Sequence, residues 1–112
     1  DIDFATMQRL VRFARYWDLV ANSGRFGNTL PVLLGDSAFE HFMAFSDWLY
    51  ANTDATHRIA LERLVALVSR YLQERGMDKA DADALLASDY AGSKPKPAET
   101  PAPKRQARRL AA

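Results

Sequence analysis

The segment RYWDLVANSGRF, residues 15–26, brings side chains of several chemical kinds close together. Arg15, Tyr16, Trp17 and Asp18 supply a cation, two aromatic rings and a carboxylate at four consecutive positions. Such residues could bind an anion, stack on a ring or exchange a proton. They are also the types that form protein docking surfaces. Which of these roles the side chains can take depends on the helices that carry them.

Asp18 and His57 are the polar residues that the helical pattern places on apolar faces. At about 100° per residue, Asp18 falls between Met7 and Val11, where an unpaired buried carboxylate would be strongly unfavourable. We expect Asp18 to be buried and paired with Arg25, His57 or capping N–H groups, as a core carboxylate that fixes helix register or, alternatively, in a functional role. His57 is expected to be a buried neutral histidine with one hydrogen bond, with a ligand or general base as the alternative.

No strong catalytic motif accompanies these residues. The sequence has no glycine-rich phosphate loop, no HExxH, no GxSxG and no Cys or His pair at metal spacing. Cysteine is absent, which excludes thiolate metal ligands and cysteine nucleophiles within these 112 residues. Asp81 and Asp83 point to different sides of a helix, and His41 is expected on a solvated face. We therefore predict no catalytic, metal or cofactor site in this chain.

Composition indicates a soluble globular domain with a distinct C-terminal end. Apolar residues make up 48%, and neither a signal peptide nor a run long enough to span a membrane is present, so a cytoplasmic location without membrane contact is expected. Residues 92–112 hold six basic residues and one acidic residue, so they carry +5 while residues 1–91 carry −4. This split favours self-association or an acidic partner for the tail. Four prolines within 91–103 predict a flexible linker.

Four amphipathic helices are predicted in residues 1–90, joined by short connections that favour antiparallel neighbours. They cover 3–22, 37–52, a segment from Asp54 to Gly76 and one from Asp78 to Asp89, with a single turn at 31–34. The fold class is therefore all-α, a small bundle followed by a Pro-rich, basic tail. The positions predicted to face the core are Phe4, Met7, Leu10, Val11, Phe13, Ala14, Trp17, Val20 and Ala21, then Phe39, Phe42, Met43, Phe45, Ser46, Leu49 and Tyr50, then Ala60, Leu61, Leu64, Val65, Leu67, Val68, Tyr71 and Leu72.

The opposite side of the first helix carries Arg9, Arg12 and Arg15, a stripe typical of a solvated or docking face. Tyr16 is predicted to point away from the core. Because the body is acidic, nucleic-acid binding by this stripe is not expected. The candidate docking residues are Arg12, Arg15, Tyr16 and the Arg25–Phe26 corner.

Several strings together resemble one family. RFARYWDLVANSGRF at 12–26, TLPVLLG at 29–35, FSDWLY at 45–50, THRIALERL at 56–64 and KRQAR at 104–108 are similar to the C-terminal region of B12-binding-type radical SAM proteins that carry a DUF4080 domain. The resemblance covers residues 4–75 and the tail.

This resemblance implies a parent enzyme with a cobalamin-binding-like domain and a central radical SAM barrel. That barrel would hold a [4Fe-4S] cluster on a CxxxCxxC motif and bind S-adenosylmethionine, and cobalamin is a further candidate cofactor. The chain begins at Asp1 without Met, so we expect it to be part of such a longer protein. Its function would be that of a C-terminal accessory domain that packs on the radical SAM core of its own chain and is not catalytic alone. The alternative is a free-standing interaction or nucleic-acid-associated adaptor that uses the basic tail.

Overall fold

The first helix, α1 (Phe4–Trp17), begins where the Asp3 carboxylate accepts a 2.7 Å hydrogen bond from the backbone N–H of Thr6. The chain then continues without a break as one π-helical segment, η1 (Asp18–Asn22). Gly24, with φ of 74°, follows this end. The helical span predicted for residues 3–22 is therefore confirmed, although its last five residues are wound as a π-helix.

The computed structural model describes residues 2–93, and all of their regular structure is helical. The prediction of an all-α fold is confirmed. Most of the predicted linker and all of the basic tail lie outside the described residues. The remaining helices are α2 (Leu30–Leu34), α3 (Ala38–Thr53), α4 (Leu61–Glu74) and α5 (Lys79–Ser93).

The connection between α3 and α4 is longer than the sequence predicts. Asp54 adopts a left-handed conformation with φ of 54° and ends α3, and Arg58 is left-handed as well, with φ of 61°. These two positions are incompatible with a continuous helix, so α4 begins at Leu61 and not directly after Asp54. Residues 55–60 are consequently a loop. The last helix, α5, is also longer than predicted, because it continues to Ser93, past the predicted end at Asp89.

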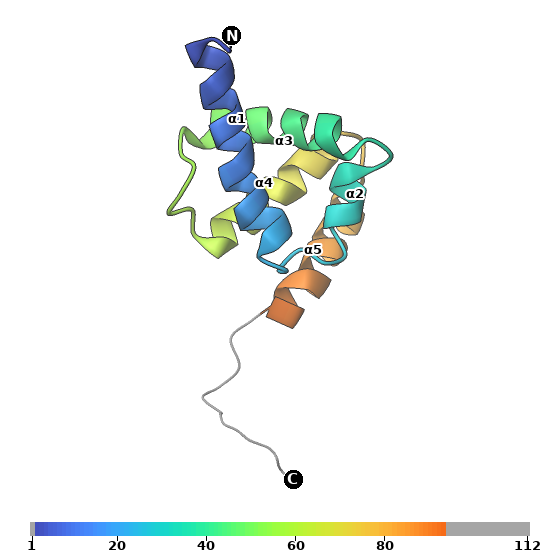
Figure 1. The fold of residues 1–112 in the computed structure, drawn as a ribbon. Helices are drawn as coiled ribbons and strands as arrows, with labels where there is room; N and C mark the ends of the chain where they lie inside the picture. The colour runs from blue at the N-terminus through green and yellow to red at the C-terminus, as the bar shows by residue number, and fades with distance from the viewer. Residues whose placement is uncertain (1, 94–112) are drawn as a thin grey trace.

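The helices lie across one another more than alongside one another (Figure 1). α1 packs on α3 and crosses it, α2 packs beside α3, and α5 packs against α4. The predicted set of antiparallel neighbours therefore does not describe the arrangement. The described residues contain no helix with the length and apolar character needed to cross a membrane.

Aromatic rings connect α1, α3 and α4 through the core. Phe42 meets Trp17 with ring centroids 4.9 Å apart and Phe45 at 5.5 Å, and Phe45 meets Tyr71 at 5.0 Å. These are edge-to-face contacts, which add to the stabilisation from burial alone. Most predicted core positions of α3 and α4 are buried, but Phe39 is 60% exposed and Ala60 is exposed in the loop, so those two predictions are wrong.

The buried face of α1 and η1 is only partly the predicted one, because Phe13, Trp17 and Val20 pack into the core as predicted while other positions do not. Tyr16 is completely buried, whereas Phe4, Met7 and Val11 are 76%, 47% and 44% exposed. Arg9, expected on the solvated side, reaches the Asp47 carboxylate of α3 at 2.7 Å. α1 carries apolar residues on two sides, and the side that includes Phe13, Tyr16 and Val20 packs on α3. Periodicity revealed an amphipathic helix but could not show which apolar side α3 covers.

Candidate functional site

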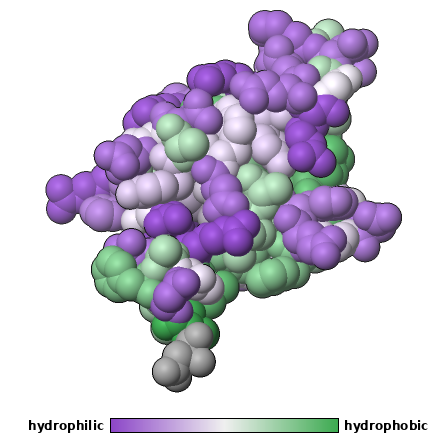
Figure 2. Space-filling view, turned by 90° about the horizontal axis from the view of Figure 1, so that it is seen from above, coloured by the Kyte–Doolittle hydropathy of each residue, from purple (hydrophilic) through white to green (hydrophobic). Residues whose placement is uncertain are grey.

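A hollow of about 530 Å³ lies between α1 and the loop that follows α3. We call it the N-terminal hollow, and it brings two predicted site residues of α1, Arg12 and Arg15, together with a third, His57, from more than 40 positions later in the sequence. Figure 2 shows hydrophobic surface interrupting the hydrophilic surface on the side of the molecule where the N-terminus lies. The hollow is lined by Phe4, Met7, Gln8, Val11, Arg12, Arg15, Tyr50, Asp54, Ala55, Thr56 and His57.

Arg12 is the cation best placed in this hollow. Its guanidinium lies over the ring of Tyr50, with Cζ 4.3 Å from the ring centroid. Its Nε is buried and has no hydrogen-bond partner within residues 2–93. No ion pair to Arg12 is formed in this part of the chain. The cation–π contact fixes the side chain and leaves its charge available to an incoming carboxylate.

Tyr16 is a structural residue and not part of a docking surface. Its hydroxyl donates a short hydrogen bond to the carbonyl oxygen of Ala55, in the loop that forms one wall of the N-terminal hollow. Burial raises the pKa of Tyr16 above its usual value, and a hydrogen bond to Thr53 opposes this. The expectation that Tyr16 points to the surface is therefore wrong, because Tyr16 is fully buried and connects α1 to the loop 55–60.

Asp18 is exposed, which contradicts the prediction that it is buried and paired in the core. Met7 and Val11, the residues between which the helical pattern places it, are exposed as well. The Asp18 carboxylate accepts a 2.7 Å hydrogen bond from the side-chain amide of Asn22, one turn later. His57 is exposed in the loop and forms no hydrogen bond with Asp18. The prediction that His57 is buried is therefore wrong as well.

Arg25 and Phe26 take separate roles. Arg25 is exposed and lines a second hollow of about 390 Å³ together with Asp18. Phe26 is only 2% exposed and belongs to the hydrophobic core, so it cannot dock a partner. The second hollow is lined by Asp18, Leu19, Ser23, Arg25, Ile59, Leu61 and Leu64.

His41 is half-buried and not solvated as predicted. Its Nδ1 lies 2.7 Å from the carbonyl oxygen of Leu34, and because a carbonyl only accepts, Nδ1 carries the proton. Gly35 lies under the ring, with φ of 54° and ψ of −135°. A Cβ at this position would approach His41 Nδ1 to 2.9 Å. Glycine is therefore required both for the backbone conformation and for this close approach.

The sequence reasoning also missed a buried carboxylate, Asp89. It is 7% exposed and accepts hydrogen bonds from the backbone of Asn28 and from Thr29 at 2.6 to 2.9 Å. The signal was present, because Asp89 continues the spacing of the buried Ala82 and Leu86 along one face of α5.

Residues 2–93 contain no group of three or more His, Cys, Asp or Glu side chains that could hold a metal ion. The predicted site residues are thus distributed over two surface hollows and the core, and the one arrangement that gathers several of them is the N-terminal hollow. Its chemistry is that of contact, with exposed apolar side chains beside two arginines.

Comparisons with protein-family models, with curated proteins and with solved structures find no match to this chain.

Proposed function

We propose that this chain is a helical accessory domain that docks on a larger catalytic unit through the exposed side of α1. The observation that carries this proposal is the row of Phe4, Met7 and Val11, which are spaced along one face of the helix and are 44% to 76% exposed. A row of large apolar side chains on one helix face is typical of a surface that another protein unit covers.

The charges around this row indicate what kind of surface would cover it. Arg12 and Arg15 line the same hollow, and neither forms an ion pair within residues 2–93. Asp54, at the opposite wall, is the one acidic residue of the lining. A complementary partner would therefore present apolar side chains with carboxylates at their edge.

The resemblance of residues 12–26 and the other quoted strings supplies a candidate for that unit. It is the radical SAM barrel of the same longer protein, which would hold the [4Fe-4S] cluster and S-adenosylmethionine, with cobalamin bound in a further domain. In this proposal the helical domain packs on the barrel or covers it, and it holds no cofactor and performs no catalytic step by itself.

Methionine oxidation tests the proposed docking in the intact protein. Met7 is 47% exposed and lies in the row, whereas Met77 is half-buried elsewhere, beside α5. The rate of sulfoxide formation by hydrogen peroxide is measured by mass spectrometry in this 112-residue chain and in the full-length protein. We expect Met7 to react at least roughly tenfold more slowly in the full-length protein, with little change at Met77.

Equal Met7 rates in the two proteins would contradict docking through α1. The identity of the unit is tested separately, because the reading frame upstream of Asp1 must encode a CxxxCxxC motif if that unit is a radical SAM barrel. Protection of Met7 without that motif would support the docking surface and reject the radical SAM assignment.

A further inference from the structure

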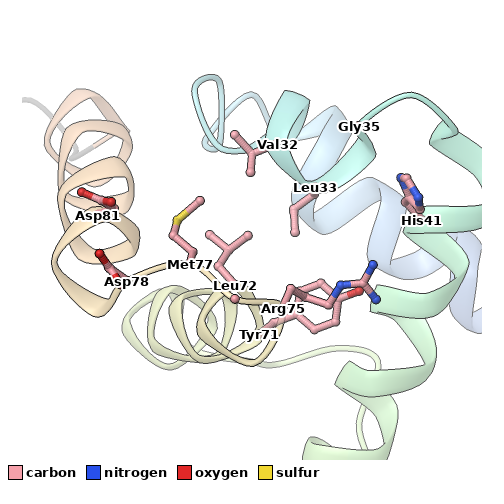
Figure 3. A pocket seen from close by; sticks show the side chains of 11 residues that line it. Val32, Leu33, Gly35, His41, Tyr71, Leu72, Arg75, Met77, Asp78 and Asp81 are labelled. Atoms are coloured by element: carbon pink, nitrogen blue, oxygen red, sulfur yellow. The ribbon is translucent and has the colours of Figure 1, made fainter.

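A further cleft lies between the end of α4, the start of α5 and the α2–α3 turn (Figure 3). It has a volume of about 490 Å³, which is within the range of small-molecule sites. We propose that this cleft, called here the α4–α5 cleft, binds a small carboxylate with an apolar body. It is lined by Val32, Leu33, Gly35, His41, Tyr71, Leu72, Arg75, Gly76, Met77, Asp78 and Asp81.

Tyr71 is the first reason for this inference. The residue is 6% exposed, and its ring is held by edge contacts to Phe45 at 5.0 Å and Trp48 at 5.3 Å. No protein group within residues 2–93 forms a hydrogen bond with its hydroxyl. Burial raises the pKa of Tyr71, although Arg75 opposes this, so the hydroxyl remains a protonated donor at neutral pH. The ring of Tyr71 is therefore fixed in the core while its hydroxyl has no protein partner, and a positioned donor of this kind at the wall of a cleft is suited to an acceptor atom on a ligand.

Arg75 supplies a positive charge beside that hydroxyl. Its Cζ lies 5.8 Å from the Tyr71 ring centroid, and Figure 3 shows the two side chains together on the same side of the cleft. Arg75 has no ion pair in the described part of the chain. A guanidinium next to a hydroxyl donor matches the two oxygens of a carboxylate.

The rest of the cleft restricts the ligand further. Leu33, Leu72 and Met77 lie between the Arg75 side and α5, and they offer an apolar surface for a hydrocarbon chain or ring. Asp78 and Asp81 stand on the α5 side, at the other end of the view. Their charges oppose a second negative charge on the ligand. A monocarboxylate is therefore favoured over phosphate or a dicarboxylate.

Octanoate is a suitable probe, with 1-octanol and inorganic phosphate as comparison compounds. Binding to the 112-residue chain is measured by two-dimensional NMR titration, which also locates the perturbed amides. We expect octanoate to shift amides of residues 71–78, and octanol and phosphate to bind at least roughly tenfold more weakly, which corresponds to loss of one charge-assisted contact.

Tyr71→Phe and Arg75→Gln separate binding from folding. Tyr71→Phe removes only an oxygen that has no protein partner, so the melting temperature is expected to stay within about 2 °C while octanoate binding weakens severalfold. Arg75→Gln is expected to weaken it roughly tenfold. Arg63→Gln, an exposed arginine on α4 outside the cleft, is the matched control and should bind octanoate as the unmodified chain does.

Three results would overturn the inference. They are octanol binding as tightly as octanoate, octanoate shifts confined to residues outside the cleft, and equal octanoate affinities for the chain and both cleft variants.

Discussion

The carboxylate of Asp89 holds Thr29 by two hydrogen bonds across 60 positions of the sequence. The backbone N–H of Thr29 donates at 2.9 Å and its hydroxyl at 2.6 Å, and the N–H of Asn28 donates to the other carboxylate oxygen at 2.9 Å. Thr29 is fully buried. These bonds give acceptors to the backbone N–H groups just before α2. They also hold the connector between η1 and α2 against α5.

Asp89→Ala is expected to lower the free energy of unfolding by about 2 to 3 kcal/mol, because it leaves buried N–H and hydroxyl donors without an acceptor. Urea denaturation followed by circular dichroism measures this. Asp81→Ala is the control, since Asp81 is exposed on the same helix and its replacement is expected to cost less than about 0.5 kcal/mol. Equal costs for the two variants would show that the Asp89 bonds do not stabilise the fold.

The sequence predicted the positions of the helices better than the way in which they pack and connect. Helical periodicity located α1, α3 and most of α4, because each has an apolar face of adequate length. It could not reveal Asp54 and Arg58 in left-handed conformations, since neither residue is a glycine and the loop they form depends on Tyr16 from another helix. The start of α4 and the exposure of His57 were wrong for that reason.

Asp18 shows how an angular position on one helix can lead to a wrong site. The sequence places it on the same side of the helix as Met7 and Val11, and all three residues are exposed. Which side of α1 is buried is decided by the contacts of Phe13 and Trp17 with Phe42 of α3. A single helix cannot supply that information, so Asp18 was assigned to the core and Tyr16 to the surface.

The reversed burial of Asp18 and Tyr16 can be tested by mutating each residue. Asp18→Ala is expected to change the free energy of unfolding by no more than about 0.5 kcal/mol, because the exposed carboxylate loses only its bond to Asn22. Tyr16→Ala is expected to cost about 3 to 5 kcal/mol, as for other large buried aromatic residues. Urea denaturation of both variants provides the comparison. A larger loss for Asp18→Ala than for Tyr16→Ala would reverse the assignment of the α1 faces.

Stability at alkaline pH is expected to depend on Tyr16. Because burial raises its pKa in the folded chain above the usual value of 10.0, the unfolded chain loses the phenolic proton first. The unfolded state then binds fewer protons, so this contribution is fully present below about pH 10 and is lost as the pH rises through the folded pKa. In Tyr16→Phe, urea denaturation between about pH 9 and 11 should therefore show a shallower decline in stability. A decline as steep as in the unmodified chain would mean that Tyr16 does not contribute.

Gly35 offers the sharpest test of local geometry. At Gly35→Ala the new methyl group would lie 2.9 Å from His41 Nδ1, and the backbone would have to keep φ of 54° and ψ of −135°, a region that residues with a Cβ rarely adopt. We expect a loss of about 2 to 4 kcal/mol from strain and from displacement of the His41–Leu34 hydrogen bond. Gly24→Ala isolates the backbone term, because Gly24 has φ of 74° but no neighbour within 4 Å, and about 1 kcal/mol is expected there.

Gly27→Ala completes this series, since nothing lies within 4 Å of its Cβ and its φ is not in the left-handed region. Its effect is expected to be neutral or slightly stabilising, because alanine reduces the entropy of the unfolded chain. Urea denaturation of the three variants should therefore rank Gly35→Ala as most destabilising, then Gly24→Ala, then Gly27→Ala. NMR of the His41 ring adds an independent measure, since displacement by the new methyl group should weaken the Nδ1–H bond to Leu34 in Gly35→Ala alone. If Gly35→Ala were as stable as Gly27→Ala with an unchanged His41 signal, the close packing of the α2–α3 turn against His41 would be refuted.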